Sequence, residues 1–313
     1  MQNARKKLSL VVPFYNEEEG VARFFARINL VFAPILDHYD LEVCCVNDGS
    51  RDHTLEELVR ARESNPYIRI IDLSRNFGKE AAITAGLDFA SGDIVVPIDA
   101  DLQHPPEVVL EMLKKWEEGF EVVLARRTDR TTDRPIQKLA ARAFYKAIRY
   151  ISRVEIPADV GDFRLMDRKV VNAVKSLREN CRFMKGIFAW VGFRTTIVDY
   201  KVEPREHGQT SFNMWKLWNF AVEGITSFST VPLRVWSYFG GLISLLAFVY
   251  GLYLIVKTLL LGVETPGYAS LMVVLLFTAG VQLISIGILG EYLGRVFSEA
   301  KRRPSYIVRE VIE

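Results

Sequence analysis

Two aspartates one residue apart are the first candidates for chemistry in this 313-residue chain. Asp99 and Asp101 follow the apolar run 94–98, which is typical of a buried strand. Two carboxylates so close repel each other unless a cation neutralises them, and hard divalent ions such as Mg²⁺ and Mn²⁺ prefer oxygen ligands. The spacing therefore predicts a divalent metal site, to which Gln103 could add a carbonyl oxygen. The alternative is a capping role, because a helix is expected to begin near Pro105.

Other polar and aromatic residues follow the other expected strands in the first half of the chain. Asp48 could accept a hydrogen bond from a nucleoside base or ribose, or it could cap the turn before the next helix. Pro13 and Tyr15 could wall the base, and Glu17 could accept a hydrogen bond from the ribose or the base. One polar turn holds candidates for contact with a diphosphate: Arg75, Asn76 and Lys79. A solvated helix start is an equal alternative for these three residues.

The elements that must position these residues alternate between strand and helix. Apolar, β-rich runs predict strands at 8–13, 41–46, 68–73, 94–98 and 122–125, and helical periodicity predicts helices at 17–36, 54–63 and 79–90. This alternation indicates βαβ units and a parallel sheet, in which ligands bind beyond the carboxyl ends of the strands. We therefore expect the polar candidates to meet at one edge of an α/β sheet. Later segments predict helices at 134–152 and 168–177 and a strand at 195–202.

The composition excludes several classes of protein. The chain has 40 Lys and Arg residues against 38 Asp and Glu residues, and this near-neutral balance gives no reason to expect a nucleic-acid partner. A 25% share of charged residues argues against a disordered chain. The three cysteines, Cys44, Cys45 and Cys181, form no disulfide or metal-binding pattern, so we expect a reducing, cytosolic setting.

Two long uncharged segments near the end of the chain exclude most purely soluble classes. Between Arg234 and Lys257 lie 22 consecutive uncharged residues, and between Glu264 and Glu291 lie 26. Each exceeds the roughly 20 residues needed to cross the hydrocarbon core of a bilayer. The sequence thus predicts a transmembrane hairpin at about 235–257 and 267–290, with buried helices of a large soluble core as the alternative. Basic residues on both flanks place the large domain and the tail on the cytoplasmic side.

These patterns divide the chain into four parts. We expect a cytoplasmic domain at 1–209, an interfacial juxtamembrane region rich in aromatic residues at 210–232, the hairpin region at 233–290 and a cytoplasmic tail at 291–313. A last core helix is the alternative for the juxtamembrane region. Glycines in the hairpin could serve packing within it or the formation of a homo-oligomer equally.

Four ordered segments resemble glycosyltransferase family 2, the inverting nucleotide-sugar enzymes with the GT-A (Rossmann-like) fold. They are VVPFYNE at 11–17, VNDGS at 46–50, RNFGK at 75–79 and DADLQHPP at 99–106. With the hairpin included, the resemblance extends over almost the whole chain. It points to the polyprenyl-phosphate glycosyltransferases, the group that contains dolichol-phosphate mannose synthase and bactoprenol glucosyltransferases. The Gln-x-x-Arg-Trp motif of processive polysaccharide synthases does not occur, which disfavours polymerisation.

The resemblance implies roles for individual donor-side residues. Asp48 would contact the nucleoside. Asp99 and Asp101 would bind the metal on the diphosphate, and Gln103 would complete the metal shell. Asp101 would also be a catalytic residue.

On the acceptor side, the resemblance implies that Arg126, with Arg127 as a nearby alternative, and Arg205 bind the acceptor phosphate. A surface ion pair is the alternative for each arginine. Asp162 would act as the base or orient the acceptor, with Asp159 as second choice. The alternative for Asp162 is a loop carboxylate paired with Arg164 or Arg168.

The implied reaction transfers a hexose from a nucleoside diphosphate to the phosphate of a membrane polyprenyl (undecaprenyl) phosphate. The second pKa of a phosphomonoester is about 6, so the acceptor is largely dianionic at neutral pH and a strong general base is not required. We expect UDP-glucose as donor, with GDP-mannose or a modified UDP-sugar as alternatives, and a multi-pass protein of the inner (plasma) membrane. The competing class of function is a non-catalytic, membrane-anchored scaffold that binds nucleotide sugars.

Overall fold

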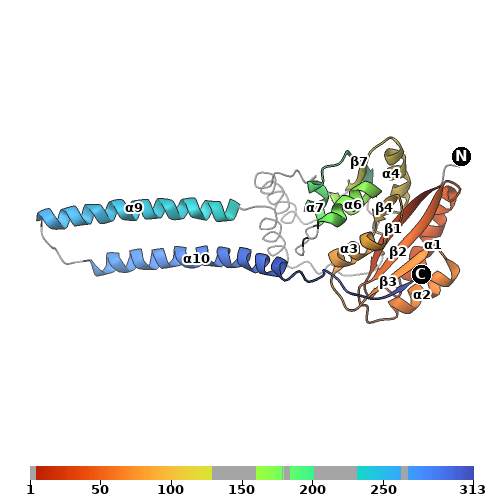
Figure 1. Ribbon diagram of the computed structural model, residues 1–313, viewed down its shortest axis with the longest axis horizontal. Coiled ribbons are helices and arrows are strands. Elements are labelled where there is room, and N and C mark those ends of the chain that lie inside the picture. Colours follow the sequence, from red (N-terminus) through yellow and green to blue (C-terminus); the bar gives the residue numbers. More distant parts are fainter. Residues whose placement is uncertain (1–4, 129–159, 178, 180–183, 201–230, 262–266) are drawn as a thin grey trace.

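Within the part of the chain that the structure describes, eight strands form one mixed sheet at the centre of the larger part of the molecule (Figure 1). The computed structural model describes residues 5–128, 160–177, 179, 184–200, 231–261 and 267–313. The strands are β1 (Lys6–Phe14), β2 (Tyr39–Asn47), β3 (Ile68–Leu73), β4 (Ile94–Pro97), β5 (Val122–Arg127), β6 (Val160–Asp167), β7 (Thr195–Tyr200) and β8 (Val308–Ile312). Their order across the sheet is β7-β5-β6-β4-β1-β2-β3-β8.

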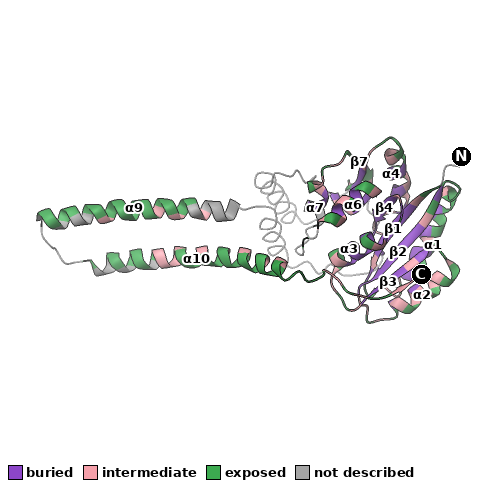
Figure 2. Cartoon of the chain, in the orientation of Figure 1, coloured by how far each residue is buried: buried purple, intermediate pink, exposed green. Residues whose placement is uncertain are grey.

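Helices cover both faces of this sheet, and each face has its own apolar core. The helices α1 (Val21–Phe32), α2 (Thr54–Ser64) and α4 (Glu107–Glu117) cover one face, and α3 (Lys79–Phe89), α6 (Arg168–Ser176) and α7 (Met184–Trp190) cover the other. Side chains alternate between the two faces along each strand. In β1, for example, Leu10 and Val12 pack on the α1 side, whereas Val11 packs on the α3 side. Figure 2 shows the central strands β1 to β4 as mostly buried, which explains their largely apolar sequences.

The predicted parallel sheet is confirmed for β1 to β4, and two later strands, β6 and β8, for which the sequence predicted no strand, run antiparallel. The strand β1 pairs in parallel with β2 and β4, and β2 pairs in parallel with β3. In contrast, β6 runs antiparallel between β4 and β5, and β8 runs antiparallel beside β3. Because β6 runs antiparallel to β4, the first residues of β6 lie near the carboxyl end of β4.

A pair of long helices extends away from the sheet (Figure 1). These are α9 (Val231–Leu261) and α10 (Tyr268–Ala300), and their described side chains are mostly exposed and apolar (Figure 2). Within the described residues, Val273–Ala300 is long and apolar enough to cross a membrane, and a shorter apolar stretch, Tyr238–Tyr253, lies in α9. Water does not support so much exposed apolar surface, so this hairpin requires an apolar environment.

The end of the chain differs from the expected tail. Residues from 291 onward contain the last turns of α10 and the edge strand β8, which returns the chain to the sheet. The expected juxtamembrane region at 210–232 and the helix at 134–152 lie almost wholly outside the described residues. Cys44 and Cys45 are buried, unpaired thiols in β2, and Cys181 is also outside the described part.

Candidate active site

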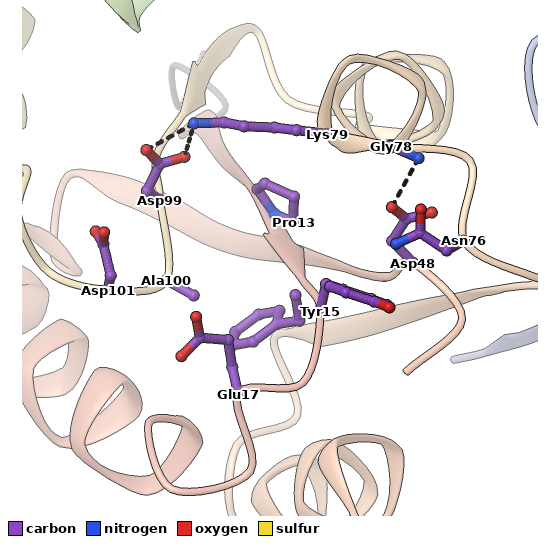
Figure 3. A pocket seen from close by; sticks show the side chains of 11 residues that line it. Pro13, Tyr15, Glu17, Asp48, Asn76, Gly78, Lys79, Asp99, Ala100 and Asp101 are labelled. Atoms are coloured by element: carbon purple, nitrogen blue, oxygen red, sulfur yellow. Dashed lines mark hydrogen bonds and ion pairs between the residues drawn. The ribbon is translucent and has the colours of Figure 1, made fainter. Parts of the chain in front are cut away.

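A cavity of about 290 Å³ opens at the carboxyl ends of β1, β2 and β4 (Figure 3). It is lined by Pro13, Phe14, Tyr15, Glu17, Asp48, Asn76, Gly78, Lys79, Asp99, Ala100 and Asp101. One cavity therefore brings together seven residues that the sequence assigned to the nucleotide sugar: Pro13, Tyr15, Glu17, Asp48, Asn76, Lys79 and Asp99. Arg75, the other candidate, is not among the lining residues, and its guanidinium lies 4.0 Å from the centroid of the Phe77 ring. Its volume is near the lower end of the roughly 300–1,000 Å³ typical of small-molecule sites.

The turn after β1 presents Tyr15 and Glu17 to this cavity. Asn16, between them, adopts φ 53, a left-handed conformation that asparagine tolerates better than most residues. The Asn16 side chain accepts a hydrogen bond from the backbone N–H of Arg51, and the backbone N–H of Asn16 donates to Ser50 Oγ. The Tyr15 ring is 44% exposed. Its position at the pocket edge makes it available for stacking on a base.

Asp48 joins the two turns that form the opposite wall. Its buried carboxylate accepts hydrogen bonds from the backbone N–H groups of Phe77 (2.7 Å) and Gly78 (2.9 Å). Burial raises the pKa of Asp48 in spite of these two donors. The neighbouring Gly49 has φ +61, and a Cβ there would lie 2.3 Å from the backbone carbon of Arg75. The turn after β2 and the loop after β3 are thus packed backbone to backbone, which requires glycine at 49.

The Asp99 carboxylate is held by a cation from α3. Lys79 Nζ lies 2.6 Å from Asp99 Oδ1 and 2.7 Å from Oδ2 (Figure 3). Burial opposes the charge on Lys79, but Asp99, Asp162 and Asp101 together raise its pKa. A protonated amine is therefore fixed at the mouth of the pocket, where an anionic ligand would enter.

Asp99 and Asp101 fit a divalent ion that is shared with a ligand. Asp101 is exposed, and its Oδ1 accepts a hydrogen bond from the backbone N–H of Gln103 at 3.1 Å. Leu102, between Asp101 and Gln103, has φ 56. This conformation is uncommon for a bulky residue, and such conformations cluster at functional sites. In the described ranges, no three His, Cys, Asp or Glu residues form a complete metal cage. Two hard carboxylates that need further oxygen ligands suit Mg²⁺ or Mn²⁺ carried by a diphosphate.

His104 is a buried residue of this site that sequence reasoning did not assign. Its ring stacks on Phe163 (centroids 4.9 Å apart), and both rings meet Tyr200 edge-on at 5.9 and 5.8 Å. Burial lowers the pKa of His104, and its Nδ1 lies 3.5 Å from Asp99 Oδ2 without a hydrogen-bond partner in the described part of the chain. His104 belongs to the DADLQHPP segment, so its place in that motif could have indicated that it lies near Asp99.

Asp162 lies near this cluster because β6 begins where β4 ends. Its charge favours the protonated forms of both Lys79 and His104, although it is not the largest influence on either and burial still lowers the pKa of His104 overall. Arg164 does not pair with it at ion-pair distance: the Arg164 guanidinium stacks 4.0 Å above Phe188 and donates to the Gly161 carbonyl at 2.6 Å. Burial lowers the pKa of Arg164 to about 10.

The second arginine considered for Asp162 is also engaged elsewhere. Arg168 donates to the backbone carbonyls of Ala90 and Gly92 at the other edge of the sheet. The geometry among the described residues therefore does not favour a simple ion pair of Asp162 with either arginine.

Arg126 is in a bidentate ion pair. Its Nε and Nη2 donate to the two carboxylate oxygens of Asp199 on β7, at 2.7 and 2.9 Å. This contact lowers the pKa of Asp199. It is the surface ion pair that the sequence left open, so binding of an acceptor phosphate by Arg126 would require Asp199 to share or release it. Arg205 and Asp159 lie outside the described residues.

Comparison with known proteins identifies two segments. The model of "Glycosyl transferase family 2" matches residues 9–175, and that of the "GtrB C-terminal hairpin" matches residues 231–296. Among solved structures, glucosyl-3-phosphoglycerate synthase from Mycobacterium tuberculosis, determined with Mn²⁺, UDP-Glc and phosphoglyceric acid, matches with a TM-score of 0.47 and 20% identity, covering 71% of this chain and 78% of that one.

Several curated proteins are similar over nearly their whole length. The uncharacterized glycosyltransferase sll0501 of Synechocystis sp. is 54% identical over 305 residues, covering 97% of this chain and 95% of that protein. The prophage bactoprenol glucosyl transferase homolog of Escherichia coli is 47% identical over 305 residues, covering 97% and 99%. The bactoprenol glucosyl transferase of Shigella phage SfV is 48% identical over 303 residues, covering 97% and 98%.

These matches confirm the resemblance that four motifs and a hairpin had indicated. The family match begins in β1 and ends in α6, so it includes the whole pocket. The hairpin match, together with the apolar stretch in α10, indicates association with a membrane. The chain therefore belongs to glycosyltransferase family 2 and is a glycosyltransferase with a GT-A domain and a GtrB-type C-terminal hairpin.

Proposed function

We propose that this protein transfers glucose from UDP-glucose, with inversion, to the phosphate of a membrane polyprenyl phosphate such as undecaprenyl phosphate. The observation that carries the proposal is the one cavity in which six expected donor-binding residues lie together with the Asp99–Asp101 pair: Pro13, Tyr15, Glu17, Asp48, Asn76 and Lys79. The relatives named bactoprenol glucosyl transferase support glucose as the sugar. GDP-mannose and modified UDP-sugars remain the alternative donors.

Donor binding would use the walls of the pocket. The exposed Tyr15 ring and Pro13 would flank the base, while Asp48, Glu17 and Asn76 would offer polar contacts to the nucleoside. In this proposal Asp48 has two tasks, since its carboxylate already organises the turn around Gly78. A carboxylate oxygen can accept more than one hydrogen bond, so both tasks are compatible.

The leaving diphosphate would be stabilised by positive charge at the pocket mouth. Lys79 is held there by Asp99, and the neighbouring carboxylates raise its pKa and so favour its charged form. Asp99, Asp101 and Gln103 would hold Mg²⁺ or Mn²⁺, which when bound neutralises charge on the departing phosphates. Preorganised cations at the site where charge develops are usually the largest contribution to such a step.

The acceptor phosphate would enter from the side of β6. One of its oxygens forms a bond to the anomeric carbon while the bond from that carbon to the diphosphate breaks, and UDP leaves with the electron pair. Because the acceptor is already an anion, Asp162 would serve mainly to orient it, and Arg126 and Arg205 would bind its phosphate. Orientation of a reactive nucleophile is itself a major source of rate.

The membrane topology that we propose follows from the path of the chain. The chain leaves the domain through α9 and returns through α10 to β8, a strand of the same sheet. Both ends of the hairpin must then lie on the side of the domain. The basic flanks favour the cytoplasmic side of a plasma membrane, with two crossings.

The proposal is tested with purified full-length protein, undecaprenyl phosphate and a panel of radiolabelled UDP- and GDP-sugars. We expect label from UDP-glucose to enter the organic phase, with loss of transfer after chelation of divalent ions and recovery with Mg²⁺ or Mn²⁺. Transfer from GDP-mannose alone would show that GDP-mannose, and not UDP-glucose, is the donor. Binding of UDP-sugars without transfer from any donor would support the non-catalytic scaffold instead.

A further inference from the structure

The strand that follows the hairpin, β8, pairs with β3, and the loop after β3 carries residues that line the cavity. In the antiparallel pairing of β8 with β3, Leu73 lies opposite Val308 and Asp72 lies opposite Glu310. Arg309 is therefore the extra residue of a β-bulge. A bulge redirects the side chain of the inserted residue, and bulges are frequent next to active sites.

From this position, Arg309 contacts Asp72 near the end of β3 and Ser74 just after it. Its Nη1 donates to Asp72 Oδ2 at 3.1 Å, and its Nη2 donates to the carbonyl oxygen of Ser74 at 3.0 Å. The Ser74 N–H in turn donates to the Ile307 carbonyl at 2.9 Å. Ser74 is the residue from which the loop 75–78 departs, so β8 fixes the start of that loop.

Asp72 continues the contact toward the pocket. Its side chain is only 2% exposed, and its Oδ1 accepts a hydrogen bond from Asn47 Nδ2 at 2.7 Å. Asn47 Oδ1 accepts from the Ser50 N–H at 3.3 Å, on the far side of Asp48. One guanidinium thus supports both turns that face each other across the Asp48 carboxylate.

We propose that Arg309 is a positioning residue for donor binding. It holds the turn that carries Asp48 and the loop that carries Asn76, Gly78 and Lys79 in the register that a nucleoside diphosphate requires. The membrane hairpin and the donor pocket are thereby joined through β8. This inference rests on the proposed function, because it takes the cavity to be the nucleotide site.

A planar guanidinium suits this task better than an ammonium group. Arginine presents several N–H donors in a fixed plane and can serve a carboxylate and a carbonyl together, whereas lysine offers a point charge. The Arg309 side chain is 58% exposed, so its charge attraction to Asp72 is screened. The geometry of the Arg309 guanidinium therefore matters more than its charge for holding the two turns. A substitution that keeps the charge but loses the geometry can thus distinguish a positioning role from simple stabilisation.

The test compares Arg309→Lys and Arg309→Met in the full-length protein, with measurement of the Kd for UDP, the KM for UDP-glucose, kcat and the melting temperature. Arg309→Lys keeps a counter-charge for Asp72 but gives up the contact with Ser74. We expect it to melt close to the wild type yet to raise Kd and KM roughly fivefold, the effect of one lost hydrogen bond. We expect Arg309→Met to raise both at least roughly tenfold and to melt earlier, with kcat at saturating donor nearly unchanged.

A matched control lies at the other end of the same strand pair. Glu313, the residue that follows β8, pairs with Arg69 in β3, far along the strands from the pocket. We expect Glu313→Gln to leave Kd and KM at wild-type values. The double variant Asp72→Asn with Arg309→Met removes the buried charge and should recover thermal stability without recovering donor affinity.

Two results would overturn the inference. Unchanged Kd and KM in Arg309→Met, with only a lower melting temperature, would show a purely structural role. An equal rise in Glu313→Gln would show general loosening of β8 and no specific positioning. Failure of the wild type to bind any UDP-sugar would instead refute the proposed function, so the two failures are distinct.

Discussion

Replacement of Lys79 by methionine tests the electrostatic basis of the proposed reaction. The variant keeps the aliphatic stem and removes the ammonium group that lies 2.6 and 2.7 Å from the two Asp99 oxygens. In the wild type this group can both neutralise Asp99 and face the diphosphate. Its loss should therefore affect the chemical step and the metal site in opposite directions.

The structure sets the size of each effect. The Lys79 side chain is 47% exposed and that of Asp99 is 25% exposed, so the pair contributes only about 0–1 kcal/mol to folding. A preorganised donor or cation at developing negative charge is worth about 2.7–4 kcal/mol, or about 100- to 1,000-fold in kcat. Without Lys79, Asp99 carries an uncompensated charge, so the apparent affinity for Mg²⁺ should rise.

Transfer of labelled sugar to lipid, measured against Mg²⁺ concentration at saturating donor, checks both effects. We expect Lys79→Met to melt near the wild type, to lose at least roughly 100-fold in kcat and to need less Mg²⁺ for half-maximal activity. Lys79→Arg is the matched control and should keep most of the activity. A kcat within threefold of the wild type in Lys79→Met would refute this account of Lys79.

Three further predictions concern separate parts of the domain. We expect Asp162→Asn to cut transfer far more than UDP binding, and near-normal turnover would remove Asp162 from the mechanism. Gly49→Ala should destabilise the domain by about 1–3 kcal/mol, seen by denaturant unfolding, because of its φ +61 and the 2.3 Å approach to Arg75. Glu42 has its pKa lowered to about 2: burial opposes this, but hydrogen bonds from Ser9, Ser91 and Lys7 outweigh it. Its stabilisation is therefore present above the ordinary value of 4.5 and is lost as pH falls toward 2, so the stability gap between wild type and Glu42→Gln should narrow over that interval.

The sequence predicted the first strands and the shared location of the polar candidates well because these signals are local. Buried parallel strands are continuous apolar runs, and the expected strand at 68–73 coincides with β3. The polar candidates follow strand ends, and parallel strands bring those ends to one edge. Asp48 and Asp99, 51 positions apart, therefore line the same cavity as expected.

The parts that were missed depend on contacts between distant segments. The strand β6 contains Asp162, Arg164 and Asp167, so its apolar pattern is weak, and Arg164 is buried there by stacking on Phe188. No local pattern shows that β8 pairs with a strand more than 200 positions earlier, or that Arg126 meets Asp199. Long-range pairing of charged residues is decided by the folded geometry.

The most direct measurement of the central claim is the structure of the lipid product. Purified protein should be incubated with UDP-glucose and undecaprenyl phosphate, and the extracted lipid examined by mass spectrometry and by NMR of the anomeric proton. The proposal predicts a single glucose joined through a phosphodiester in the β configuration, opposite to that of the donor. An α-linked product, or UDP release without a glucosylated lipid, would contradict it.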